Sequence, residues 1–204
     1  MTPPLDLAVV AKSAEMRLIS LLFSRPSPAR GEIAALAAEI PAGPLREAAD
    51  RLAGLDEPVY VAIFGPGGPV SPREVAYSRL DAGRIVSDVA AFYDAFAYRP
   101  KAEDPLDHVA VETGFVAFLH LKEAFAAARG DAEAAGVTAQ ARDRFTAEHL
   151  GPLAGGIVRR LRSIESPDLL ALARILLERT GAAEPAEEPP ADEGADEISC
   201  PGRG

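Results

Sequence analysis

The chain has 204 residues, enough to bury a good core in one domain, or in one domain followed by a tail. Its net charge of −10 argues against nucleic acid or an anionic membrane surface as the main partner, because both bind basic surfaces. A lone cysteine, Cys200, excludes an internal disulfide bond. Without a basic signal sequence or an apolar stretch long enough to cross a membrane, the chain is expected in the cytoplasm.

The composition favours an all-α protein. Apolar residues make up 48% of the chain but aromatic residues only 6%, and Trp is absent. Leu, Ala and Val must therefore fill the core, and long runs rich in Ala and Leu are typical of helices. Clusters of β-branched residues with the alternation of a strand are missing. We predict a single helical bundle.

The spacing of apolar residues and the positions of Pro and Gly set the expected helix boundaries. The expected helices cover residues 7–23, 31–40, 44–53, 56–64, 73–97, 105–129, 131–150, 153–164 and 167–179. For the fifth of these, a break near Gly83 is an alternative. The sixth should be the longest and most buried, with one apolar stripe formed by Val111, Phe115, Phe118, Leu121 and Phe125.

The segment 65–72 is too rich in Gly and Pro to be a helix or a central strand. It resembles a phosphate-binding loop only superficially. Pro66 and Pro69 lack the N–H donors that such a loop needs, and no Gly-Lys-Ser or Gly-Lys-Thr follows. A rigid connector that lines a groove fits the composition better.

The end of the chain differs from the rest. Residues 181–204 contain seven acids against Arg203 and almost no apolar residue to bury. Such a composition favours disorder. We therefore divide the chain into a helical domain, 1–180, and a disordered acidic tail, 181–204, whose usual effect would be to raise solubility.

An Asp-His pair lies at the start of the expected central helix. Asp104 can cap this helix with Pro105 as its first residue, and Asp107 then becomes the third helical residue, where an acid suits the helix dipole. A helix gains nothing from His108 at its positive end. A functional role and a merely local one both stay open for His108.

The sequence offers no pattern for a metal site or a hydrolase. His108 and His120 are twelve residues apart on one expected helix, which separates them by about 18 Å at 1.5 Å per residue. There is no Gly-x-Ser-x-Gly, and Cys200 lies in the tail without a base near it in sequence. We expect no cofactor and no enzymatic activity.

Aromatic residues flank the Gly- and Pro-rich loop. Core packing explains Phe64, whereas Tyr60 and Tyr77 have a polar tip and often border a groove. A helical protein with such a loop and border fits a peptide- or protein-binding module.

Several motifs in a fixed order carry a family resemblance. They are Tyr60-x-x-Ile63-Phe64-Gly65-Pro66-Gly67-Gly68-Pro69, Pro72-Arg73-Glu74-Val75-Ala76-Tyr77, Tyr98-Arg99-Pro100, Pro105-x-Asp107-His108-x-x-x-Glu112 and Phe145-x-x-x-His149-Leu150-x-Pro152. With them the chain resembles the TorD/DmsD/NarJ family of molybdoenzyme-specific chaperones. The resemblance implies a helical, non-enzymatic, cytoplasmic protein. Its partner would be the catalytic subunit of a DMSO-reductase-type molybdenum-cofactor oxidoreductase, bound through its twin-arginine signal peptide or N-terminal region before export.

The resemblance also implies a set of client-binding residues. These are Tyr60, Phe64, Gly65, Pro66, Pro72, Glu74, Tyr77, Asp104, Asp107, His108 and Glu112. The sequence departs from the family pattern at Arg73, Val75 and Leu153, which bears on which client is bound.

In the mechanism that we expect, the apolar stretch of the leader lies in a groove beside the 65–72 loop. Its arginines then meet Asp104, Asp107 and Glu112. For Glu112, exposure on the helix surface or an ion pair with Arg99 are alternatives.

Two other classes of protein stay open at this point. One is a permanent helical accessory subunit of a respiratory complex. The other is a small nucleotide-binding protein or enzyme that uses His108. The sequence does not decide between a monomer and a dimer with swapped helices.

Overall fold

The computed structural model describes residues 4–26, 30–100 and 104–186. Within these ranges the chain forms helices and no strand, which confirms the predicted all-α fold. An isolated bridge between Arg73 and His108 is the one β-type pairing there. The α-helices are α1 Leu7–Phe23, α2 Arg30–Glu39, α3 Pro44–Leu52, α4 Glu57–Phe64, α5 Ala82–Ala95, α6 Val109–Ala128, α7 Ala132–Phe145, α8 Gly151–Leu161 and α9 Pro167–Thr180.

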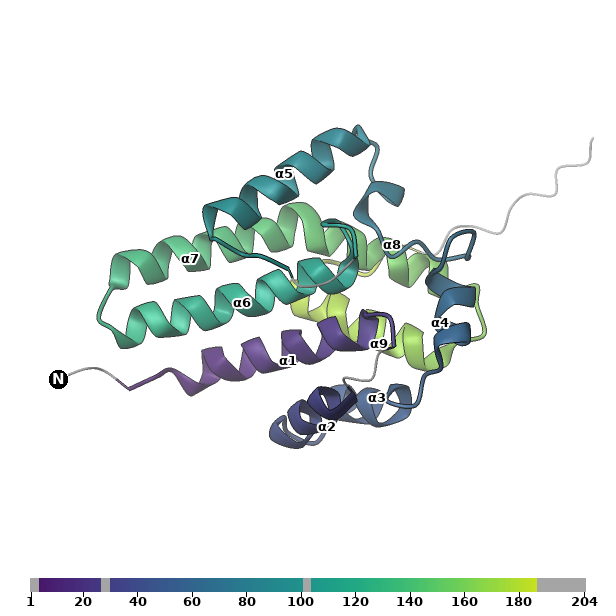
Figure 1. Ribbon diagram of the computed structural model, residues 1–204, viewed down its shortest axis with the longest axis horizontal. Helices are drawn as coiled ribbons and strands as arrows, with labels where there is room; N and C mark the ends of the chain where they lie inside the picture. The colour runs from purple at the N-terminus through teal and green to yellow at the C-terminus, as the bar shows by residue number, and fades with distance from the viewer. Residues whose placement is uncertain (1–3, 27–29, 101–103, 187–204) are drawn as a thin grey trace, which may run out of the picture.

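The helices form a bundle around α6 (Figure 1). Helix α1 runs antiparallel to α6 on one side, and α7 lies on the other. Helix α9 packs against α8 and α3, while α5 crosses above α7 in the view of Figure 1. The short α4 lies at the end of the molecule where α1 finishes.

The first half of α6 is buried on every side, and three small residues, Ser13, Ser20 and Gly114, let its neighbours approach closely. Ser20 Oγ donates to Ala110 O at 2.7 Å, and Ser13 Oγ donates to Ala117 O at the same distance. A Cβ at Gly114 would lie 2.9 Å from the Tyr98 hydroxyl, so glycine is needed there. These contacts fix the register of α1 on α6.

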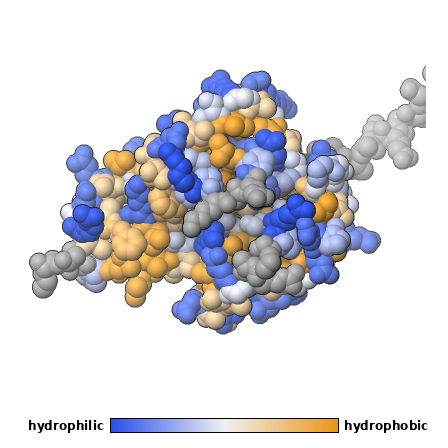
Figure 2. Space-filling model, viewed as in Figure 1, coloured by the Kyte–Doolittle hydropathy of each residue, from blue (hydrophilic) through white to orange (hydrophobic). Residues whose placement is uncertain are grey.

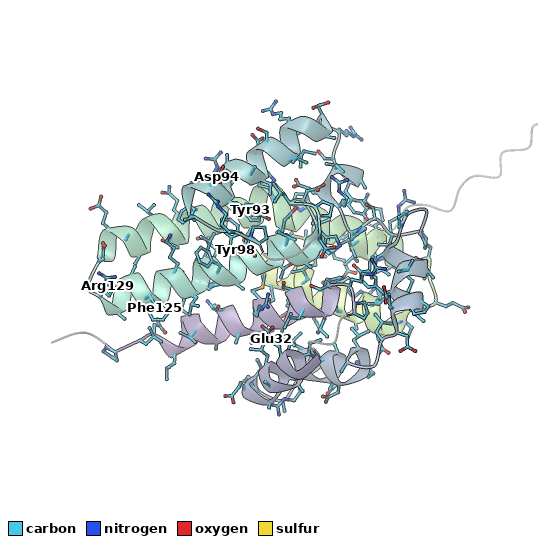
Figure 3. The ribbon with its side chains drawn as sticks, viewed as in Figure 1. Glu32, Tyr93, Asp94, Tyr98, Phe125 and Arg129 are labelled. Carbon is cyan, nitrogen blue, oxygen red and sulfur yellow. The ribbon has the colours of Figure 1, made fainter. Side chains whose placement is uncertain are left out.

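The predicted apolar stripe of α6 is only half correct. Phe115 is fully buried, but Leu121 is 38% and Phe125 54% exposed. Beyond His120, Ala124 is the one fully covered residue of the helix. Leu7 of α1 is exposed at the same end, and Figure 2 shows an apolar patch there, close to the Phe125 labelled in Figure 3.

Two predicted boundaries are wrong. The expected helix 73–97 is a short 3₁₀ turn, Glu74–Ala76, followed by α5, which starts at Ala82 with Asp81 as N-cap. The break therefore comes before Gly83. Helix α6 starts at Val109 rather than Pro105, and His108 is its N-cap instead of Asp104. In both places an extended residue precedes the helical turn: Arg73 in the first and His108 in the second, which pair with each other as described below.

Helices α7 and α8 are joined without a loop. The π-helical turn Thr146–Leu150 links them, and Gly151 N–H donates to Thr146 O across five residues. Pro152 lies in the first turn of α8, where its missing N–H costs least. The wider turn adds one residue to the helix and changes the face on which His149 lies.

Helix α9 ends at Thr180, with Gly181 in the left-handed region at φ +71°. Glu184 then forms ion pairs with Arg162 at 2.8 Å and Arg174 at 3.2 Å. The predicted disordered tail lies, from residue 187 on, outside the described residues. None of the helices in the described ranges has the length and apolarity needed to cross a membrane.

Candidate functional site

Residues 70–77, which we call the strap, connect the Gly- and Pro-rich loop to the segment before α5. The strap pairs with the residues just before α6: Val109 N–H donates to Pro72 O at 2.8 Å, and Glu74 N–H donates to Asp107 O at 2.9 Å. This pairing holds His108 in an extended conformation, after a turn in which the His108 N–H donates to Pro105 O. It explains why α6 starts later than the local sequence suggests.

Asp107 lies under the strap with no exposed surface. Its carboxylate accepts from Arg73 Nε at 3.0 Å and lies 2.9 Å from Arg73 Nη2. The Val75 N–H also donates to it, at 3.4 Å. Asp107 therefore neutralises Arg73 and holds the strap, and it is not on the surface that we expected it to share with Asp104.

His108 caps α6 with its ring. Its Nδ1 accepts the Ala110 N–H at 3.1 Å, so the proton of the neutral ring is on Nε2. Nε2 lies 3.4 Å from the Tyr60 hydroxyl, which itself donates to Phe23 O at 3.2 Å. Burial lowers the pKa of His108 and Arg73 lowers it further, against the effect of Asp104 and Asp107. The expectation that the helix gains nothing from His108 is wrong.

The strap, α4 and the start of α6 enclose a recess of about 520 Å³, which we call the Tyr60 groove. Most of the predicted binding residues line it: Tyr60, Phe64, Gly65, Pro66, Pro72, Asp104 and His108. The rings of Tyr60 and Phe64 are 5.2 Å apart and each residue is 5% exposed, so the groove meets only their edges. Its wall is otherwise the backbone of the Gly- and Pro-rich loop.

Two arginines that were not among the predicted binding residues also line the Tyr60 groove: Arg25, and Arg73, which the sequence analysis named only as a departure from the family pattern. Arg25 donates to Glu57 at 2.7 Å, and Arg73 is paired with Asp107. Asp104 has no ion-pair partner in the described part of the chain. The charge of Asp104 is therefore not neutralised by any arginine among the described residues.

A second cluster lies on the other side of the strap. Glu74 is 5% exposed, and its carboxylate oxygens lie 3.1 and 3.2 Å from Nδ1 of His149. The π-helical turn carries His149 to this position. Phe92 and Phe145 pack edge-on or tilted against the His149 ring, at centroid distances of 5.6 and 5.0 Å.

Glu112, like Asp107, is a carboxyl group with no exposed surface. Burial raises its pKa well above the usual value, and the charges of Glu74 and Asp107 and a hydrogen bond with Glu74 raise it further. Neither of its oxygens has an N–H or O–H donor among the described residues. A hydrogen bond between Glu112 and Glu74 therefore requires that one of the two carboxyl groups be protonated. Both earlier interpretations of Glu112 are wrong, because it is fully buried and Arg99 is paired with Asp94.

This second cluster borders a cleft of about 930 Å³ between α5 and the α7–α8 helix, which we call the α5 cleft. Its lining includes Glu74, Tyr77, Phe92, Phe96, Arg144 and His149. Arg144 lies over the Phe92 ring at 5.6 Å. The strap thus separates two clefts, and the predicted residues Glu74 and Tyr77 belong to the α5 cleft rather than to the Tyr60 groove.

Some of the site residues that were missed stand in a recognisable sequence pattern, and others do not. His149 stands inside a motif quoted for the family resemblance, although it was not placed in the site. Arg25 follows the first helix among Ser and Pro residues, a context typical of any helix end. Nothing in the local pattern of Phe92 distinguishes it from a core residue.

A comparison with known protein families places the chain in a family of molybdoenzyme assembly chaperones. The family described as nitrate reductase delta subunit matches residues 26–159, a span that includes the strap and all of the predicted site residues. The chain belongs to this family, which confirms the resemblance drawn from the motifs. Among curated proteins none matches the chain.

Proposed function

We propose that this protein is a dedicated cytoplasmic chaperone for the catalytic subunit of one molybdenum-cofactor oxidoreductase. It binds the leader peptide or N-terminal region of that subunit and retains it until the cofactor is inserted, before twin-arginine export. The observation that carries this proposal is the Tyr60 groove, an apolar recess inside the span that matches the family. At its edge lies Asp104, an acid without an ion-pair partner among the described residues.

The geometry divides the predicted residues into two roles. Tyr60, Phe64 and the loop backbone offer an apolar wall for the hydrophobic stretch of a leader. Asp104 meets an arginine of the leader, in a charge-assisted hydrogen bond. Asp107 and Glu112 act from below, because both are fully buried, and position the strap instead of touching the client.

Titration of a synthetic leader peptide tests the role of Asp104. The variant Asp104→Asn should weaken binding, by about tenfold for the loss of one charged contact. Asp50→Asn removes an exposed acid of α3 outside the groove and should change nothing. Equal affinities of the two variants would remove Asp104 from the binding site.

Affinity purification from the native host, grown without oxygen, tests the proposal as a whole. Mass spectrometry should find one molybdoenzyme catalytic subunit with its leader uncleaved. Recovery of the mature, exported enzyme instead would indicate a permanent accessory subunit. If no such subunit is recovered, the chaperone role is refuted.

A further inference from the structure

A third surface recess, of about 640 Å³, lies between α8 and the segment that follows the strap. We call it the arginine groove. Its lining includes Arg159 and Arg160 of α8, Arg162 and Ser163 just after that helix, and Tyr77 and Ser78 from across the groove. Burial raises the pKa of Tyr77 to about 12, and the nearby charges of Arg160 and Arg159 oppose this rise.

The arginines of this groove are unevenly paired. Arg162 donates to Glu184 and to the carbonyl oxygen of Pro185, both at 2.8 Å. Arg159 and Arg160 are exposed and have no carboxylate partner in residues 4–26, 30–100 or 104–186. The Nε of Arg162 is buried and likewise has no acceptor in those ranges. The positive charges of Arg159 and Arg160 thus lie side by side without an acidic partner in those ranges, on a chain whose net charge is −10.

The contact with Glu184 and Pro185 shows where the rest of the chain begins. Both residues bind the edge of the arginine groove, and residue 187 is only two positions beyond Pro185. The segment that follows contains Glu187, Glu188, Asp192, Glu193, Asp196 and Glu197. An anchored acidic chain therefore starts beside a basic surface that lacks acidic partners.

We propose that the acidic C-terminal segment, residues 187–197, binds in the arginine groove and places its carboxylates against Arg159 and Arg160. Each exposed ion pair is weak alone. The contacts of Arg162 with Glu184 and Pro185 favour binding of the segment, because they tether it beside the groove. A short tether gives it an effective concentration of the order of millimolar. A free acidic peptide would have to compete with that concentration.

Tyr77 and Ser78 line both the arginine groove and the α5 cleft, so the two recesses are neighbours. The inference does not depend on the proposed function, since it concerns two parts of the same chain.

The single cysteine permits a direct test on the full chain. A nitroxide label on Cys200 broadens the NMR signals of nearby amides and requires no mutation. We expect broadening of the amides of Arg159, Arg160 and Ser163 at low salt. It should disappear in 0.5 M NaCl, because salt screens exposed charges. In the double variant Arg159→Gln, Arg160→Gln it should disappear at low salt as well.

Arg129→Gln is the matched control. Arg129 is exposed and follows the last residue of α6. It lies far from the end of α9 (Figures 1 and 3). This variant should keep the broadening. Broadening that survives the double variant, or that is absent from the wild type, would refute the proposal and leave the tail as a solubility segment.

A mixed sample excludes a second copy as the occupant. Spin-labelled chains without ¹⁵N are mixed with ¹⁵N chains that carry no label. The proposal predicts no broadening in this mixture. Broadening of the groove amides there would show that the tail binds another molecule of the protein, against the intramolecular contact proposed here.

Discussion

At the scale of single residues, the buried acid Glu112 controls how the site responds to pH. Burial and the neighbouring carboxylates keep it protonated in the folded protein to a pH well above its usual pKa of 4.5. The unfolded chain releases the same proton near that value. The folded state therefore binds more protons above about pH 4.5, and the free energy of unfolding falls there as the pH rises, by up to about 1.4 kcal/mol per unit.

The variant Glu112→Gln should remove this pH-dependent loss in the free energy of unfolding. Glutamine has nearly the shape of a protonated glutamate, and its NH₂ group can donate to Glu74. We expect a gain in the free energy of unfolding that is small at pH 5 and grows with pH, measured by urea denaturation. In Glu39→Gln, a change of an exposed acid on α2, the difference from wild type should stay constant with pH. A constant difference for Glu112→Gln as well would show that Glu112 is ionised in the fold.

His108 gives a prediction with the opposite sign. Burial lowers its pKa below 6.5, so its contribution to stability is present above pH 6.5 and is lost as the pH falls. Protonation of Nδ1 also removes the acceptor for the Ala110 N–H. His108→Ala should cost about 1 kcal/mol at pH 7, the usual value of an N-cap.

The variant His108→Asn separates the cap from the ring. Asn is a good N-cap residue, so stability at pH 7 should be largely restored. Leader-peptide binding should stay weak if the imidazole contacts the client. Equal loss of stability in both variants, by urea denaturation, would mean that the contact between the ring and Tyr60 matters more than the cap.

The sequence could identify Asp107, His108 and Glu112 as unusual but could not assign their burial. Their positions depend on the strap, which is more than thirty residues away in the chain. An acid near a helix start is usually exposed and favours the dipole. Only the antiparallel pairing of the strap with residues 107–109 places Asp107 under Arg73.

At the scale of elements, two adjacent glycines of α8 have opposite environments. A Cβ at Gly156 would overlap the ring of Tyr77, whereas at Gly155 it would lie 4.0 Å from Leu177 Cδ1, an ordinary contact. Gly156 thus allows the strap to lie against α8. The pair gives a matched test of that contact.

Gly156→Ala should destabilise the protein by roughly 1–3 kcal/mol, because Tyr77 must leave its place on α8. Gly155→Ala should stabilise it by about 0.5–1 kcal/mol through helix propensity. Thermal or urea unfolding measures both. If Gly156→Ala were as stabilising as Gly155→Ala, the contact between Tyr77 and α8 would not contribute to stability.

Helix boundaries were predicted well where the local sequence decides them. Pro and Gly residues end α1 and start α3 as expected, and Pro167 opens α9. The prediction failed around the strap and at the π-helical turn. There, contacts with other parts of the chain determine the backbone conformation. In residues 73–97 these tertiary contacts outweigh the local preference for a helix.

At the scale of the whole molecule, the fold class followed from composition because the long Ala- and Leu-rich runs allow one kind of element. The arrangement of the helices and the two clefts did not follow. It depends on which helix faces meet, and α6 is apolar on nearly all sides in its first half. The sequence of such a helix predicts that the helix is buried, but it does not predict which helices pack against it.

The same arrangement predicts how stability is distributed. Helix α6 packs against α1 and α7 along much of its length, whereas Ala37 is the buried residue of α2. Amides in the first half of α6 should exchange only with global unfolding, and those of α2 much sooner. Hydrogen exchange followed by mass spectrometry measures both. Equal protection of α2 and α6 would mean that the bundle unfolds in a single step.

The pairing of α1 with α6 also has a consequence for synthesis. Ser13 and Ser20 of α1 bond to Ala117 and Ala110, about a hundred residues later in the chain. A ribosome adds roughly 5–20 residues per second, so the apolar face of α1 waits on the order of ten seconds for its partner. During that interval the nascent chain exposes a hydrophobic helix. We therefore expect that the nascent protein needs a chaperone of its own while it is being made.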